Sequence, residues 1–221
     1  MHISDGILPI EQCVVWFAVA VPFIGIGLKQ IRERSKTNLK YKPLLAFLAA
    51  IVFVLSMVPI PVPIAGTCSH PAGTGITAII TGPFVSVVLA SIALLLQAIF
   101  LAHGGITTLG ANIVSMGIMG SLGGYFTFKI LRKIGVNLGI AGFIAGIMAD
   151  WFTYTTTSFE LAFALAGKGE FFETFLKILL AFVPTQLPIG IAEGFITSAV
   201  VVMLAKRTDI IEKINLQEGE R

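Results

Sequence analysis

The sequence predicts an all-α membrane protein with about seven transmembrane helices, an N-terminus outside and a C-terminus in the cytoplasm. Three observations predict this class. Of the 221 residues, 56% are hydrophobic and 12% are charged, whereas soluble domains carry roughly 25% charged residues. Residues 43–128 contain no Asp, Glu, Lys or Arg. Long apolar runs such as VSVVLASIALLLQAIFLA favour helices over the alternating segments of a transmembrane barrel.

The basic residues predict the orientation of these helices. Most of them form three clusters: Lys29, Arg32, Arg34, Lys36, Lys40 and Lys42; Lys129, Arg132 and Lys133; and the tail after Leu204. The positive-inside rule places all three in the cytoplasm. The helices then run inward over 9–28, outward over 43–60, inward over 105–130, outward over 137–166 and inward over 174–204. Because no basic residue precedes the first apolar stretch, we expect no cleavable signal peptide.

The segment 76–102 must begin and end outside, and it is short for two spans of about 20 residues each. Gly82-Pro83 interrupts it, because proline cannot continue a helix interior. We therefore expect one shortened helix, a turn at Gly82-Pro83 and a full helix to Ala102. A re-entrant hairpin, leaving five full spans, is the alternative. The chain is expected to form one membrane domain over residues 1–207, followed by a cytoplasmic tail over 208–221.

The three histidines all fall near the outer surface in this topology. His2 follows Met1, and the Met1 amine, the His2 peptide nitrogen and His2 Nδ1 can close two adjacent chelate rings on one metal ion. If the amide loses its proton, these nitrogens lie in a plane that one further imidazole completes. Square-planar nitrogen sites suit Ni(II) or Cu(II), and low-spin Co(II) is a further candidate. Binding would release protons and should weaken in acid.

His70 is the better fourth ligand, because glycines and prolines make the surrounding loop stiff and give it room for a metal. His103 is expected in the second shell of ligands or as a gating residue. Cys68 is expected to pack in the loop near the metal, and Asp5 either to turn the N-terminal arm into the bundle or to hydrogen-bond a ligating group. A hydrogen-bonded structural role is the alternative for each histidine.

Three acidic residues fall inside expected helices: Asp150, Glu160 and Glu193. Ionisable groups are costly in lipid and are therefore functional candidates, with a paired structural role as the alternative. The sequence contains no P-loop, HExxH or GxSxG motif and no dinucleotide fingerprint. The chain therefore shows no catalytic or ATP-hydrolysing motif of its own, and we do not expect an enzyme.

Four segments, MHISDGILP, GTCSHPAGTG, LAHGGITTLGAN and PTQLPIGIAEG, together resemble the CbiM/NikM family. Its members are the substrate-binding membrane components of energy-coupling-factor (ECF) importers for cobalt or nickel. The resemblance extends through about Arg207 and implies that Met1, His2 and His70 bind the ion, the same set that the chelate argument reached. The GTCSHP form resembles the cobalt-associated members linked to cobalamin biosynthesis, and nickel is the alternative ion.

The resemblance also implies partners and a location. The family's small-residue contact with the coupling subunit maps to Ala46 and Ala50. A coupling subunit of CbiQ type, ATPases of CbiO type and a small accessory protein of CbiN or NikN type would complete the importer in the plasma membrane. A proton-coupled secondary metal carrier, suggested by Asp150 and Glu193, is the competing function, and a membrane metalloenzyme ranks last because no general base stands beside the histidines.

Overall fold

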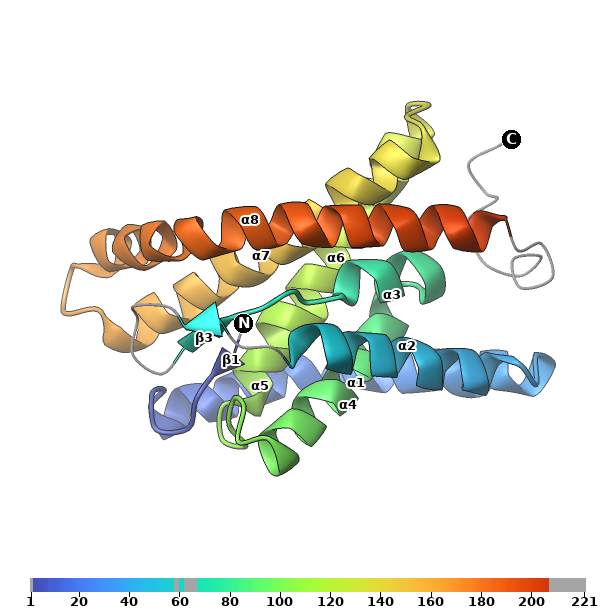
Figure 1. The fold of residues 1–221 in the computed structure, drawn as a ribbon. Coiled ribbons are helices and arrows are strands. Elements are labelled where there is room, and N and C mark those ends of the chain that lie inside the picture. Colours follow the sequence, from blue (N-terminus) through green and yellow to red (C-terminus); the bar gives the residue numbers. More distant parts are fainter. Residues whose placement is uncertain (1, 58–59, 62–66, 207–221) are drawn as a thin grey trace.

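The computed structural model describes residues 2–57, 60–61 and 67–206, which form a helical bundle with a small sheet at one end (Figure 1). Six helices are separate: α1 (Ile10–Thr37), α2 (Tyr41–Ser56), α3 (Thr74–Thr81), α4 (Pro83–Phe100), α7 (Leu138–Leu165) and α8 (Phe171–Ala205). A seventh is the continuous run of α5 (Leu109–Asn112), the π-helix η1 (Ile113–Met119) and α6 (Gly120–Lys133). The helical class and the number of helices are confirmed.

Five of these helices are long and apolar enough to cross a membrane, so the chain is a multi-pass membrane protein. The break at Gly82-Pro83 is also confirmed: α3 ends at Thr81, Gly82 has a φ of 91°, and Pro83 is the first residue of α4. At a rise of 1.5 Å per residue, α3 is about 12 Å long and covers less than half of a typical hydrocarbon core. The preceding extended residues lead into it from the sheet (Figure 1).

Several helix ends differ from the expected ones, and two of the differences have a clear physical reason. Helix α1 continues to Thr37 and not to residue 28, because its added turns carry Arg, Lys and Glu, which are good helix formers, and Arg32 and Lys36 are exposed. Helix α2 ends at Ser56 and not at residue 60, before a proline-rich stretch whose prolines disfavour helical conformation in the residues that precede them.

The helix ends that carry the basic clusters lie at the same end of the bundle. Leu204 near the end of α8 packs against the cluster that includes Ile31 of α1 and against the cluster that includes Leu131 of α6. These ends lie opposite the N-terminus and the sheet (Figure 1). The bundle therefore has one basic end, and its position in the cytoplasm stays a prediction of the positive-inside rule.

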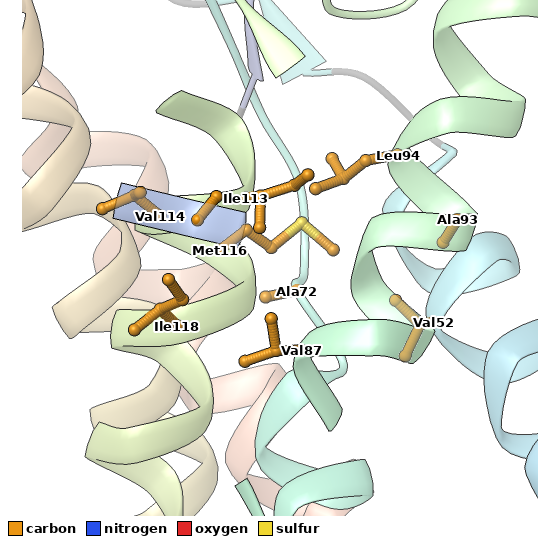
Figure 2. Close-up of a cluster of buried hydrophobic side chains, with 10 residues drawn as sticks. Val52, Ala72, Val87, Ala93, Leu94, Ile113, Val114, Met116 and Ile118 are labelled. Carbon is orange, nitrogen blue, oxygen red and sulfur yellow. The ribbon is translucent and has the colours of Figure 1, made fainter. Parts of the chain in front are cut away.

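A buried apolar cluster joins α1, α2, α4 and η1 to the loop that precedes α3. It contains Ala20, Val52, Ala72, Val87, Ala93, Leu94, Ile113, Val114, Met116 and Ile118. Figure 2 shows Ala72 between the side chains of Met116 and Val87. Because Ala72 follows His70 by two residues, the bundle core fixes the loop that carries this histidine.

Helices α7 and α8 pack closely through small residues. A Cβ added at Gly146 would lie 2.8 Å from the carbonyl oxygen of Glu193 and 2.9 Å from Gly194 Cα. Small residues allow such close backbone approach between membrane helices. The contact brings Asp150 on α7 and Glu193 on α8 to the same part of the interior.

Candidate metal centre

A short ladder of strands joins the N-terminal arm to the loop that carries His70. Strand β1 (His2–Ile3) pairs antiparallel with β3 (Thr67–Ser69), and His2 lies opposite Cys68. Strand β2 (Ile60–Pro61) pairs with the other side of β3. Directly opposite residues in such a pair lie close together, so the pairing places His2 beside the Cys68-Ser69-His70 segment.

The arm is held by hydrogen bonds to the chain around α5. Asn112 accepts a hydrogen bond from the Ile3 backbone nitrogen at 2.7 Å and donates to the Ile3 carbonyl at 3.1 Å. Thr108 Oγ1 donates to the same carbonyl at 2.6 Å. Asp5 accepts from the backbone nitrogens of Ile106 at 3.2 Å and Thr107 at 2.8 Å. The arm is thus anchored at Ile3 and at Asp5, which positions the adjacent His2.

The two expected histidine ligands meet in the interior. His2 is 1% exposed, His70 is 0% exposed, and His2 Nδ1 lies 2.5 Å from His70 Nε2. His70 Nδ1 lies 2.9 Å from the Pro71 carbonyl oxygen. A carbonyl can only accept, so His70 Nδ1 carries the proton and its Nε2 directs a lone pair towards His2. Without an ion, a proton on His2 Nδ1 can be donated to this lone pair, and with an ion, both nitrogens can face the metal.

His103 and Cys68 complete a group of four metal-ligating side chains. The His103 ring centroid lies 4.4 Å from that of His2 and 5.5 Å from that of His70. His103 Nε2 is 3.0 Å from Cys68 Sγ. Ala102, with a φ of 48°, and Gly104, with a φ of 80°, turn the chain around His103. One ligand atom from each of the four residues lies within 4.8 Å of the others, which is close enough for one ion.

Burial controls the protonation of this group. It lowers the pKa values of His2 and His70 well below the usual value, and it lowers the pKa of His103. For His2, the neighbouring His70 adds to the fall in pKa, while the Gln97 side chain opposes it. Burial also raises the pKa of the Cys68 thiol. Neutral imidazoles are the form that ligates metals, so nitrogen donors are available at neutral pH while the sulfur stays protonated.

Asp5 is bound to a loop and not to a histidine. The Thr107 hydroxyl, which donates a hydrogen bond to Asp5, lowers the pKa of this carboxyl. Gly105 leaves the space that the carboxylate fills, because an added Cβ there would collide with Asp5. Asp5 was expected either to turn the N-terminal arm into the bundle or to hydrogen-bond a ligating group. Its contacts with Ile106 and Thr107 correspond to the first role, because they fix the arm against the bundle.

Two of the three intramembrane acids lie behind the His70 loop. Glu193 accepts hydrogen bonds from the backbone nitrogens of Ala72 at 2.7 Å and Gly73 at 2.8 Å. Gln186 accepts from Ser69 Oγ at 3.0 Å when its amide nitrogen donates to Asp150 Oδ1 at 3.0 Å and Oδ2 at 3.1 Å. These contacts connect α7 and α8 to both sides of His70.

The remaining expected site residues lie elsewhere. Glu160 is fully buried, and its carboxylate has no hydrogen-bond partner within the described residues. Ala46 and Ala50 are exposed on α2, next to Phe47, which is 62% exposed. Met1 and residues 208–221 lie outside the described part of the chain, so the amine ligand and the tail stay predictions.

Known proteins resemble this chain over nearly its whole length. The cobalt transport protein CbiM of Geobacter sulfurreducens is 54% identical over 220 residues, which are 99% of this chain and 64% of that protein, so this chain spans less than two thirds of that relative. The cobalt transport protein CbiM of Sorangium cellulosum is 48% identical, over 98% of this chain and 96% of that protein.

A solved structure shares the fold. The crystal structure of a truncated transition metal transporter superposes with a TM-score of 0.82 and 26% identity, over 94% of this chain and 99% of that one. The sequence model described as "CbiM: Cobalt uptake substrate-specific transmembrane region" matches residues 2–210. Because this model matches residues 2–210, the chain belongs to the CbiM family.

Proposed function

We propose that this chain is the substrate-binding membrane component of an ATP-driven ECF importer for cobalt ions, which would supply cobalamin biosynthesis. The ion is held by the Met1 amine, the His2 peptide nitrogen, His2 Nδ1 and His70 Nε2. The chain binds the ion and performs no chemistry on it, so ATP hydrolysis falls to partner subunits.

The observation that carries this proposal is the pair of facing nitrogens, His2 Nδ1 and His70 Nε2, at 2.5 Å in a buried position. Two neighbouring ligands at right angles, each about 2.0 Å from a metal as in Zn–N bonds, would lie roughly 2.8 Å apart. A small adjustment of one ring therefore admits a cation between the two nitrogens. The main-chain nitrogens on the terminal side of His2 supply the other two positions.

The donor set and the relatives support cobalt as the ion. A plane of four nitrogens suits Ni(II) and Cu(II) as well, so nickel is the alternative substrate and the protein's environment would decide which ion is carried. The CbiM relatives are named as cobalt transport proteins, and this favours Co²⁺ for the present chain.

The exposed small-residue face of α2 supports the proposed assembly. Ala46 and Ala50 lie one helical turn apart and leave a shallow surface on which a partner helix could pack closely. We propose that the CbiQ-type coupling subunit docks there, with ATPases of CbiO type bound to that subunit and an accessory protein of CbiN or NikN type beside the complex.

A proton-coupled carrier receives less support from the geometry. Such a carrier would need acids that exchange protons along the transport route, and Asp150 and Glu193 were its candidates. Glu193 accepts hydrogen bonds from two backbone N–H groups, and Asp150 accepts from the Gln186 amide. Both acids thus have partners that favour a structural role.

An N-terminal extension tests the proposed function. Adding several residues ahead of Met1 removes the amine from the chelate while leaving the His2 and His70 side chains in place. Binding of Co²⁺ to the purified chain, measured by isothermal titration calorimetry, should then weaken by more than the 10- to 100-fold that outer-shell changes cost. The same extension placed after Arg221 is the control and should change nothing. Full affinity in the N-terminally extended chain would show that the amine is not a ligand.

A further inference from the structure

His2 has a ring nitrogen that the proposed ligand set leaves unused. Because Nδ1 faces His70, a neutral His2 ring that ligates through Nδ1 must carry its proton on Nε2. That nitrogen is buried and has no hydrogen-bond partner within the described residues. Metal-ligating histidines almost always donate their second N–H to an acceptor, which fixes the tautomer and the orientation of the ring. His70 follows this rule through the Pro71 carbonyl, whereas no acceptor for His2 Nε2 lies among the described residues.

Gln97 near the end of α4 offers a matching acceptor. Its side chain is 0% exposed, and its Oε1 is a buried acceptor that also has no partner within the described residues. Its amide nitrogen donates to the Phe53 carbonyl at 3.1 Å and to Ser56 Oγ at 2.8 Å. Both amide hydrogens of Gln97 are therefore donated to α2, and this fixes which end of the amide is the oxygen. Its Oε1 has no donor among the described residues.

The chain around Gln97 also encloses the His2 ring. The Gln97 carbonyl accepts hydrogen bonds from the backbone nitrogens of Leu101 at 3.0 Å and His103 at 3.2 Å. A Cβ added at Gly104 would lie 3.2 Å from His2 Cδ2, the carbon bonded to Nε2. One buried donor and one buried acceptor thus lie in the same small region, and neither has a hydrogen-bond partner in the part of the chain that the structure describes.

We propose that Gln97 is a positioning residue for the metal site: its Oε1 accepts the Nε2–H of His2 when the ion binds, which holds Nδ1 towards the metal. This inference rests on the proposed function, because it assumes that Nδ1 ligates the ion. Unpaired buried groups are costly, so the bound state gains from joining them. The link runs from the ion through His2 and Gln97 to Phe53 and Ser56 on α2.

Affinity measurements on the full chain with a free N-terminus test this role. Gln97→Met keeps the length of the side chain and removes the acceptor, and it should weaken Co²⁺ binding by about 10- to 100-fold. Gln97→Glu keeps an acceptor and should bind more tightly than Gln97→Met. The matched control is Gln12→Met on α1, whose amide donates to the Phe163 carbonyl; it should bind as the unmodified chain does. Equal affinity of Gln97→Met and the unmodified chain would overturn the inference.

A spectroscopic measurement separates positioning from a general structural effect. Cu²⁺ serves as a paramagnetic probe, because it accepts four nitrogens in a plane. Pulsed EPR detects the uncoordinated nitrogen of each bound imidazole, and its coupling depends on the hydrogen bond at that nitrogen. In Gln97→Met the signal of one imidazole should shift, while that of His70, bonded to Pro71, should stay. A shift of both signals, or of neither, would contradict the assigned role.

The two proposals fail in different ways. If the unmodified chain does not bind Co²⁺, or binds it equally well with an extended N-terminus, the proposed function fails. If the unmodified chain binds through its N-terminus but Gln97→Met leaves both the affinity and the EPR signals unchanged, only the role of Gln97 fails.

Discussion

At the scale of single residues, ligation by His70 depends on which of its ring nitrogens carries a proton. The Pro71 carbonyl favours the proton on Nδ1 by accepting from it at 2.9 Å, so the neutral ring in this tautomer presents the lone pair of Nε2. His103 is held differently, because its Nε2 contacts Cys68 Sγ and only part of its ring is buried. The two histidines therefore differ in how directly they can serve the ion.

Substitution of these two histidines should give different losses of metal binding. His70→Ala removes a ligand of the proposed plane and should abolish Co²⁺ binding. His103→Ala leaves four nitrogen donors in place and should weaken binding by about 10-fold, the lower end of outer-shell effects. Calorimetry on both variants, with circular dichroism as a check of folding, measures the difference. Equal losses in the two variants would place His103 in the ligand set.

Sequence reasoning reached His2 and His70 because their chemistry is visible in local order: an imidazole next to the first residue, and another in a loop of glycines and prolines. It missed Asn112 and Gln97, since amides of this kind occur in many helices with no partner evident from spacing. It also left Glu193 without a partner. That carboxylate binds backbone N–H groups of Ala72 and Gly73, which every non-proline residue possesses, so no pattern in the sequence indicates them.

At the scale of elements, the N-terminus of α3 is bound by a carboxylate from another helix, Glu193 of α8. Helix starts leave backbone N–H groups without partners inside the helix, and a negative charge there is favourable. The carboxylate of Glu193 on α8 supplies both the hydrogen-bond acceptor and the negative charge. Gly73 has a φ of 70°, which lets its own N–H and that of Ala72 face the same carboxylate. The position of α3, and of the His70 loop before it, thus depends on α8.

Glu193→Gln should destabilise the protein through this contact. The substitution replaces one acceptor oxygen with an NH₂ group that faces a backbone N–H, so one charge-assisted hydrogen bond is lost and the other weakens. The expected loss in the free energy of unfolding is about 2 kcal/mol, measured by thermal unfolding in detergent. Glu173→Gln is the matched control on the same helix, because Glu173 is exposed and pairs with Lys177 on the surface; it should unfold as the original protein does. Equal unfolding temperatures for both variants would contradict a stabilising role for Glu193.

Elements of different kinds were predictable to different degrees. The long apolar helices and the break before Pro83 follow from hydropathy and from the chemistry of proline, and both are confirmed. The strands β1 and β3 could not be predicted, because pieces of two and three residues show no periodicity and their pairing joins distant parts of the chain. The π-helix η1 likewise carries no recognised sequence signal; it follows Asn112, whose side chain holds the arm.

At the scale of the whole molecule, the bundle has two chemically different ends. One carries the arm, the sheet and the buried histidines, and the other carries the basic ends of α1 and α6 and the C-terminal end of α8 (Figure 1). Arg34 near the end of α1 donates to the Thr81 carbonyl at 2.5 Å, which ties α3 to the basic end. An importer must take its ion from outside the cell, so the proposed function requires the histidine end to face out and the basic end to face the cytoplasm.

Cysteine labelling from either side of the membrane tests this orientation. Lys40→Cys lies in the exposed turn between α1 and α2, and Lys168→Cys lies in the exposed turn between α7 and α8. In a background that lacks Cys13 and Cys68, a membrane-impermeant maleimide added to intact cells should label Lys168→Cys and leave Lys40→Cys unlabelled. In inside-out vesicles the reagent should label Lys40→Cys and leave Lys168→Cys unlabelled, because the positive-inside rule predicts that the basic turn faces the cytoplasm. Labelling of Lys40→Cys in intact cells would place the histidine end in the cytoplasm, where a site for imported ions could not be loaded.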